Sequence, residues 1–82
     1  MSQQEALVRF IEESLLRDRS ARIGPETPLF EERVLDSMNI LHLIGYVERR
    51  LGRRLTDDEL VMANFRSAGA IARAFFDGSA DG

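Results

Sequence analysis

An apolar repeat in the middle of the chain constrains the fold more than any other feature. Its members follow one another at steps of three and four residues, which places them on one face of an α-helix. Asp36 or Ser37 can cap the start of this helix, and Gly52 can end it because glycine readily adopts the left-handed conformation. No segment alternates between apolar and polar residues with a period of two, so we expect an all-α fold. The repeat consists of Ile40, Leu43, Ile44, Val47 and Leu51.

A helix before this repeat is predicted by a capping box, in which two side chains each satisfy a free backbone N–H at a helix start. Ser2 and Glu5 have the required spacing, and we expect the helix to end near Asp18. Its apolar residues again share one face, which we expect to be buried. They are Leu7, Phe10, Ile11 and Leu15.

Two further helices are predicted in the second half of the chain. Thr56 and Glu59 also have capping-box spacing and predict a short third helix through about Met62. Ser67 can cap a last helix. The residues of this last helix that we expect to pack are Ala70, Ile71, Ala74 and Phe75.

Residues 19–35 form a long connection between the first two helices. Two helix-breaking pairs, Gly24-Pro25 and Thr27-Pro28, keep it from continuing either helix. We expect the apolar pair Leu29-Phe30 to fold back onto the core. Loops longer than about 12 to 15 residues are uncommon in compact domains and are often functional. The sequence therefore predicts a small four-helix bundle, with three longer helices, a short third helix and this long loop.

The 82 residues suffice for one modest core and leave no room for a deep catalytic cavity. We expect a single domain over residues 1–77 and a flexible tail over residues 78–82. The chain has no cysteine, which excludes disulfides, thiolate metal sites and a cysteine nucleophile, and a single histidine is too few for a histidine-rich metal site. No apolar run approaches the ~20 residues of a membrane span, and the N-terminus lacks the pattern of a signal peptide, so we expect a cytoplasmic protein.

Charge is spread unevenly along a chain whose formal net charge is -3. Residues 37–55 contain one acid, Glu48, and four arginines, which suggests a small helix-turn-helix nucleic-acid-binding domain as one alternative. The last helix is a poor recognition helix, because it carries only Arg73 and has Arg66 just before it. The acids at 57–59 would also repel phosphates. Nucleic-acid binding is therefore the least favoured function.

The face of the second helix opposite its apolar repeat has an unusual composition. On a helical wheel of about 100° per residue, Met38, His42, Gly45 and Arg49 fall on this face. An apolar side chain that points outward favours contact with a partner over solubility. We therefore expect these residues, together with the loop over residues 28–35, to form a partner-binding surface.

Ser37 lies at the start of the same helix, directly after the long loop, where its hydroxyl is expected to be accessible. We expect the first backbone N–H groups of the helix to be unpaired. Together with the positive end of the helix dipole they would stabilise a phosphate ester on this serine. A serine at a helix start is in most proteins simply a cap, so this position alone does not assign a function.

Three stretches of the sequence together resemble the acyl carrier and peptidyl carrier protein family. The centre of the resemblance is Asp36-Ser37-Met38, which matches the family's Asp-Ser-Leu/Met signature at the start of the second helix. The resemblance covers nearly the whole chain, including the long loop and the short third helix. The stretches are Leu29-Phe30-Glu31-Glu32-Arg33-Val34-Leu35-Asp36-Ser37-Met38, Leu55-Thr56-Asp57-Asp58-Glu59-Leu60 and Asn64-Phe65-Arg66-Ser67.

The resemblance implies that Ser37 receives 4'-phosphopantetheine from coenzyme A and that the chain holds an acyl or aminoacyl group as a thioester. The thiol would then belong to the prosthetic arm, which agrees with a chain that has no cysteine. Ser37 would be an attachment point and not a catalytic nucleophile, because His42 lies about 140° round the helix and is not placed as its base. The resemblance thus implies a carrier that is not itself an enzyme.

The same resemblance implies the partners of the chain. A phosphopantetheinyl transferase would attach the arm, and Asp36 would help to engage that enzyme and its magnesium ion. An acyl- or amino-acid-activating ligase would load the arm, and a downstream acyltransferase or synthase would accept the cargo. We expect a monomer that binds neither nucleic acid nor membranes.

The chain departs from fatty-acid carriers in two respects. Leu35 stands before Asp36 where those proteins usually carry glycine nearby, and the second helix ends in arginines where theirs is rich in acids. The sequence therefore looks more like discrete aminoacyl, D-alanyl or peptidyl carriers. An unmodified helical docking or scaffold module with the carrier fold is the alternative, and only a test for modification separates the two.

Overall fold

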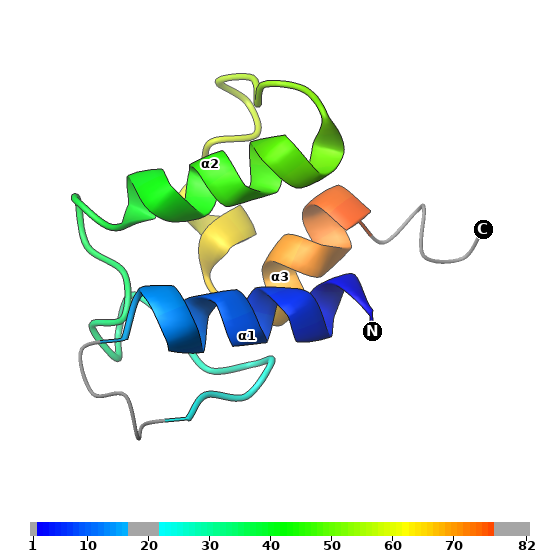
Figure 1. Ribbon diagram of the computed structural model, residues 1–82. Coiled ribbons are helices and arrows are strands. Elements are labelled where there is room, and N and C mark those ends of the chain that lie inside the picture. Colours follow the sequence, from blue (N-terminus) through cyan, green and yellow to red (C-terminus); the bar gives the residue numbers. More distant parts are fainter. Residues whose placement is uncertain (1, 17–21, 77–82) are drawn as a thin grey trace.

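The computed structural model describes residues 2–16 and 22–76, and every regular element in these two ranges is helical. In chain order they are α1 (Gln3–Ser14), α2 (Ile40–Leu51), the 3-10 helix η1 (Met62–Phe65), α3 (Ala68–Ile71) and the π-helical turn η2 (Ala72–Phe76). Figure 1 shows α1 and α2 as the two long helices, with η1, α3 and η2 packed beside them. The predicted all-α class is confirmed for the described residues.

α1 begins with the predicted capping box. The Glu5 N–H donates to Ser2 Oγ at 3.1 Å, and the Ser2 N–H donates to Glu5 Oε1 at 2.9 Å. The helix ends earlier than predicted, because the N–H groups of Leu15 and Leu16 both donate to the Ile11 carbonyl and so close the last turn. Asp18, where we expected the end, lies outside the described residues.

The apolar face of α1 packs largely as predicted. Leu7 and Ile11 are fully buried and Leu15 is nearly so. Phe10 is only half-buried. Its ring stacks on Tyr46 of α2, with ring centroids 4.3 Å apart. This ring pair joins the two long helices at the edge of the core.

α2 ends as predicted and begins later than predicted. Gly52 caps its C-terminus in the left-handed conformation, with φ of 76°, and its N–H donates to the Glu48 carbonyl. Residues 37–39 form a turn ahead of the helix, which itself starts at Ile40. Leu43 and Val47 are fully buried, and the rest of the repeat is half-buried around them.

The predicted helix from Thr56 to Met62 is wrong. The Glu59 N–H donates to the backbone oxygen of Thr56 and so makes a single turn over residues 57–59, after which Val61 is extended, with φ of -119° and ψ of 149°. Only half of the capping box forms: Glu59 Oε1 accepts the Thr56 N–H at 2.9 Å, but the Thr56 hydroxyl donates to the same oxygen at 3.2 Å and does not accept the Glu59 N–H. Arg53 also holds this carboxylate, at 2.8 and 3.0 Å. The short helix follows instead as η1 over residues 62–65.

The last helix is capped as predicted, because Ser67 Oγ accepts the Ala70 N–H at 3.0 Å. Its buried face differs from the prediction. After α3 the helix widens into the π-helical η2, so that Ile71 and Phe76, five residues apart, are both buried and Ala74 is exposed. The prediction assumed a constant α-helical period and therefore missed Phe76.

The long loop packs onto α3, as its apolar pair predicts. Leu29 is fully buried, and its N–H donates to the Arg66 carbonyl at 2.7 Å, while Phe30 is half-buried against the core. The Gly69 N–H donates to the Pro25 carbonyl, also at 2.7 Å. A Cβ on Gly69 would lie 3.0 Å from the backbone oxygen of Pro25, so this close approach of the loop favours glycine.

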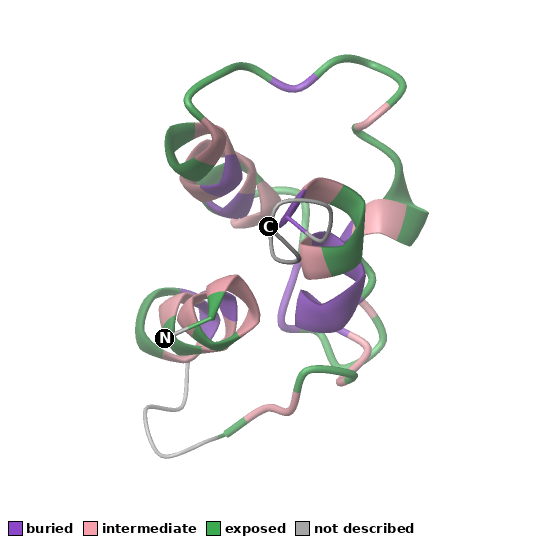
Figure 2. Cartoon of the chain, turned by 90° about the vertical axis from the view of Figure 1, so that its right-hand side faces the viewer, coloured by how far each residue is buried: buried purple, intermediate pink, exposed green. Residues whose placement is uncertain are grey.

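One core joins all the elements. Figure 2 shows that the buried residues lie on the inward sides of the helices and on the loops that close the bundle. None of the helices in the described ranges is long and apolar enough to cross a membrane. The core residues are Leu7, Ile11, Leu15, Leu29, Val34, Leu35, Leu43, Val47, Leu55, Phe65, Ala68, Ile71 and Phe76.

Candidate functional site

Asp36 and Asn39 set the conformation of the turn that leads into α2. Asp36 Oδ1 accepts the N–H groups of Met38 and Asn39, both at 2.9 Å, and the Asp36 N–H donates to Asn39 Oδ1 at 2.7 Å. The pairing is reciprocal, as in a capping box. Asn39 Nδ2 also donates to the Val34 carbonyl at 2.6 Å, which ties the turn to the buried end of the long loop. The turn is therefore held from both sides.

Ser37 lies exposed on this turn, and it is Asp36 that acts as the cap. The Ser37 side chain forms no hydrogen bond with any residue of the described ranges. Its hydroxyl is therefore accessible to a modifying enzyme without loss of a structural contact. The expectation of unpaired N–H groups here is wrong for Met38 and Asn39, because Asp36 already occupies both of them.

The predicted partner-binding residues lie mainly on the outer side of α2. Met38 is 79% exposed, and His42 and Arg49 are also exposed. Gly45 is half-buried, and a Cβ on it would lie 3.4 Å from Arg49 Nη1. The Arg49 side chain therefore runs back along α2 over Gly45, so that these two residues form one spot on the surface.

The structure adds exposed apolar residues that the sequence analysis missed. Leu41 is 67% exposed, although it lies inside α2, and Val61 and Met62 are exposed just across from the start of this helix. An indication was available for Leu41, because it falls outside the apolar repeat. Val61 and Met62 gave no such indication, since we had placed them near the end of a helix that does not form.

A shallow apolar hollow lies beside Val61 and Met62 and extends to Ile40 at the start of α2. It has a volume of about 100 Å³ and lies between α2 and the segment that contains η1. A second hollow, of about 230 Å³, lies between the long loop and η1 and shares Phe30 and Met62 with the first. The first hollow is lined by Phe30, Ile40, Ile44, Leu60, Val61, Met62 and Phe65.

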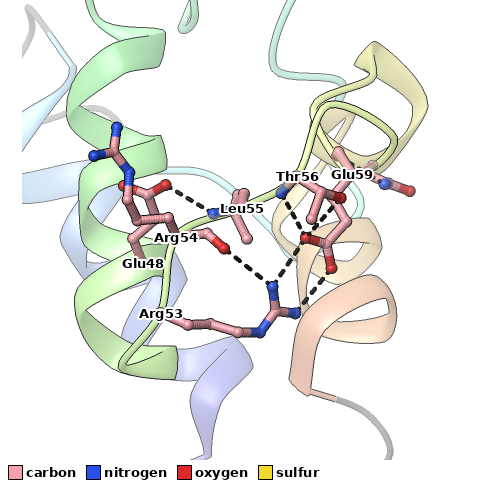
Figure 3. A network of polar contacts seen from close by, with 7 residues as sticks. Glu48, Arg53, Arg54, Leu55, Thr56 and Glu59 are labelled. Atoms are coloured by element: carbon pink, nitrogen blue, oxygen red, sulfur yellow. Dashed lines mark hydrogen bonds and ion pairs between the residues drawn. The ribbon is translucent and has the colours of Figure 1, made fainter.

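A network of polar contacts at the other end of α2 fixes the segment that follows it (Figure 3). Arg53 holds Glu59 through two hydrogen bonds, which raise the pKa of Arg53 and, together with the hydrogen bond from the Thr56 N–H, lower the pKa of the Glu59 carboxyl to about 2. Glu48 Oε2 accepts the Leu55 N–H at 2.8 Å. The only acid of α2 is thus half-buried and already engaged.

A helix-turn-helix function is disfavoured by the structure. A recognition helix must expose a face to the DNA groove. All four residues of α3, Ala68–Ile71, are buried, and the helix widens directly afterwards into η2.

A comparison with protein families gives the decisive finding. The model of the family described as "Phosphopantetheine attachment site" matches residues 5–75. The chain belongs to this family. A comparison with curated proteins found no match. The match extends from α1 into η2 and so includes the turn at 36–39, which confirms the resemblance to acyl and peptidyl carriers at the level of the family.

The family fixes the cofactor, because its domains are the sites of covalent 4'-phosphopantetheine attachment. Its carrier domains are typically not catalytic. The residues at 36–39 fit such a group, since an exposed hydroxyl stands on a firmly held turn beside an apolar hollow. When attached, the group supplies a thiol, which the chain itself lacks.

Proposed function

We propose that Ser37 carries the phosphopantetheine arm and that the chain presents an acyl or aminoacyl thioester to successive enzymes. One observation carries this proposal: an exposed serine, relieved of any capping role by Asp36, stands at the start of α2. Attachment forms a bond from Ser37 Oγ to the phosphorus next to the pantetheine of coenzyme A. The pyrophosphate bond breaks, the nucleotide leaves, and the hydroxyl proton passes to the transferase.

Asp36 has two functions in this proposal. Its carboxylate caps the turn, and because it remains exposed it also engages the transferase and the magnesium ion of that enzyme. A carboxylate is a suitable ligand for magnesium, which prefers oxygen.

We propose that the cargo is of the aminoacyl or peptidyl type and not that of a fatty-acid synthase. The support is the charge of α2. Its single acid, Glu48, is half-buried and bonded to the Leu55 N–H, whereas Arg49 and Arg50 are exposed. A partner enzyme that recognises acidic side chains on this helix would find none accessible.

The chain contributes tethering and contact surfaces. A tethered thioester reaches the partner's active site at a high effective concentration and is not lost by diffusion. Met38, His42, Gly45, Arg49 and the loop over residues 28–35 form the proposed partner surface. The partners are a phosphopantetheinyl transferase, an activating ligase and a downstream acyltransferase or synthase, met by a monomeric carrier in the cytoplasm.

The experiment that tests the attachment site is intact mass spectrometry after incubation with coenzyme A, magnesium and a broad-specificity phosphopantetheinyl transferase. The parent chain is expected to gain the mass of one phosphopantetheine group, and Ser37→Ala is expected to gain none. Ser2→Ala and Ser67→Ala are matched controls, because they remove the serines that cap α1 and α3 and should still be loaded. A well-folded parent that no transferase loads would favour the unmodified docking module.

A further inference from the structure

The charged side chains on the outer side of α2 and just beyond its end are predominantly basic. Arg49 and Arg50 occupy the last turn of the helix, and Arg53 and Arg54 follow Gly52. All four are exposed, whereas Glu48, the acid that precedes Arg49, is half-buried. We call these four arginines the basic end of α2.

The charges of the basic end are only partly compensated. Arg53 forms an ion pair with Glu59 at 2.8 Å. Arg50 donates to the neutral amide oxygen of Gln3 and lies over the Tyr46 ring at 5.7 Å, so its charge persists. Arg49 and Arg54 form no ion pair within the described part of the chain.

The same side of α2 is also apolar toward its start. Leu41, Gly45 and Arg49 follow one another at steps of four residues and therefore lie along one ridge of the helix. Leu41 and Arg49 are separated by about 12 Å along the helix axis. Met38, which is 79% exposed, extends the apolar part of this surface to the turn that holds Ser37.

A purely structural role does not account for this arrangement. Arginines in a last turn compensate the negative end of the helix dipole, which explains Arg49 and Arg50. Arg54 lies beyond Gly52 and outside the helix, and Leu41 is 67% exposed and does not belong to the core. In a chain with a net charge of -3, a surface that joins exposed apolar side chains to uncompensated arginines fits a partner of complementary character.

We infer that α2 docks onto partner enzymes whose own surface combines an apolar pocket with carboxylates. The pocket receives Met38 and Leu41, and the carboxylates meet Arg49 and Arg54. This inference rests on the proposed carrier function and deepens it by assigning a charge to the partner. Nucleic acid is a poorer match, because two exposed acids, Asp57 and Asp58, flank the basic end and the apolar part would remain unused.

The test measures kcat/KM for the attachment of the arm by a phosphopantetheinyl transferase, at low salt and at about 0.3 M NaCl, where charge attraction is strongly screened. For the parent chain, kcat/KM is expected to fall as salt rises. For Arg49→Glu/Arg54→Glu, we expect a loss of about tenfold at low salt and little remaining dependence on salt. Leu41→Gln is expected to lower kcat/KM at both salt concentrations.

The matched control is Arg9→Glu/Arg73→Glu, which changes net charge by the same amount at two exposed positions outside α2 and outside the loop over residues 28–35. The exposed ion pair between Arg73 and Glu26 that it removes contributes little to stability. This control should load within about twofold of the parent. Circular dichroism confirms that each variant is folded. Equal losses in both double variants, or none in the α2 variant, overturn the inference while the carrier function stands.

Two further outcomes also decide the matter. If duplex DNA slows loading of the parent chain but not of Arg49→Glu/Arg54→Glu, the basic end binds a polyanion, and the inference is wrong. A parent chain that is never loaded overturns the proposed function, and this inference with it.

Discussion

Ser37 and Ser67 both stand at the start of a helix and differ in almost every physical respect. Ser67 is 1% exposed, and its Oγ accepts the Ala70 N–H, so this hydroxyl is part of the fold. Ser37 is exposed, and the carboxylate of Asp36 makes the capping bonds in its place. A serine that is not needed as a cap can be modified without cost to the helix, which is the property that an attachment site requires.

The surroundings of Ser67 are packed, whereas those of Ser37 are exposed. The start of α3 is packed against the long loop through the Gly69 N–H and the Pro25 carbonyl. The turn before α2 exposes Met38 to solvent, with Leu41 close behind it. One helix start therefore serves stability, and we propose that the other serves contact; the following substitutions test this contrast.

The largest effect on stability is expected from Gly69→Ala. The new Cβ would lie 3.0 Å from the backbone oxygen of Pro25, so the loop must move slightly away from α3, whereas the exposed Glu26 side chain can rotate out of its way. Overpacking of this kind costs about 1 to 3 kcal/mol of unfolding free energy, measured by urea denaturation.

The matched control for that variant is Gly45→Ala in α2. Its Cβ would meet only the flexible end of Arg49, at 3.4 Å. Alanine is the better helix former, so we expect a gain of about 0.5 to 1 kcal/mol. If Gly69→Ala were as stable as the parent, α3 would not depend on the loop as we describe.

The two serines themselves give the most direct comparison. Ser67→Ala removes a cap and should lower the free energy of unfolding by about 0.5 to 2 kcal/mol. Ser37→Ala removes an exposed hydroxyl with no bond in the described structure and should change it by less than about 0.5 kcal/mol. Thermal melts of both variants check this prediction. A large loss in Ser37→Ala would show that this hydroxyl supports the fold after all.

Local sequence signals predicted the elements whose partners are close in sequence. The capping box of Ser2 and Glu5, the glycine cap at Gly52 and the cap at Ser67 all formed as expected, since each needs only neighbouring backbone groups. The apolar repeat of α2 likewise predicted its inward face, on which Leu43 and Val47 are buried and the other members are half-buried. The signature around Ser37 pointed to the family that the comparison then established.

The failures came from irregular local geometry. Thr56 and Glu59 form only half of a capping box, since the Thr56 hydroxyl donates to the Glu59 carboxylate, and the chain is extended again at Val61. Phe76 was missed because η2 departs from the α-helical period. Neither the incomplete capping box nor the widened turn can be predicted from residue spacing alone.

Asp36 allows the capping function to be separated from the proposed engagement of the transferase. Asn and Asp are comparable caps, so Asp36→Asn should remain about as stable as the parent, whereas Asp36→Ala should lose about 1 kcal/mol. Both variants lack the charge that would engage magnesium, and we expect both to be loaded much more slowly in the mass assay. Normal loading of Asp36→Asn would limit this residue to its role as a cap.

The smallest effect on stability is expected from loss of the ion pair between Arg53 and Glu59, which lies ahead of Ser67 in the chain. Asn64 Nδ2 donates to the Glu59 carbonyl, so the turn held by Arg53 is connected to η1 and through it to α3. The pKa of Glu59 is lowered from its ordinary value of 4.5 to about 2. A depressed carboxyl stabilises the fold above its unfolded pKa, and this contribution is lost as pH falls from about 4.5 toward about 2.

Glu59→Gln removes that contribution and tests its size. Stability of the variant, followed by urea denaturation across this pH range, should decline less steeply on acidification than stability of the parent. The difference is expected to be small, because both side chains of the pair are partly exposed and solvent screens their attraction. Loading of Ser37 at neutral pH should not fall, because the substitution removes no residue of the proposed partner surface and leaves the charge of Arg53 without its ion pair. A variant that lost loading while it stayed folded would instead connect this turn to the surface around α2.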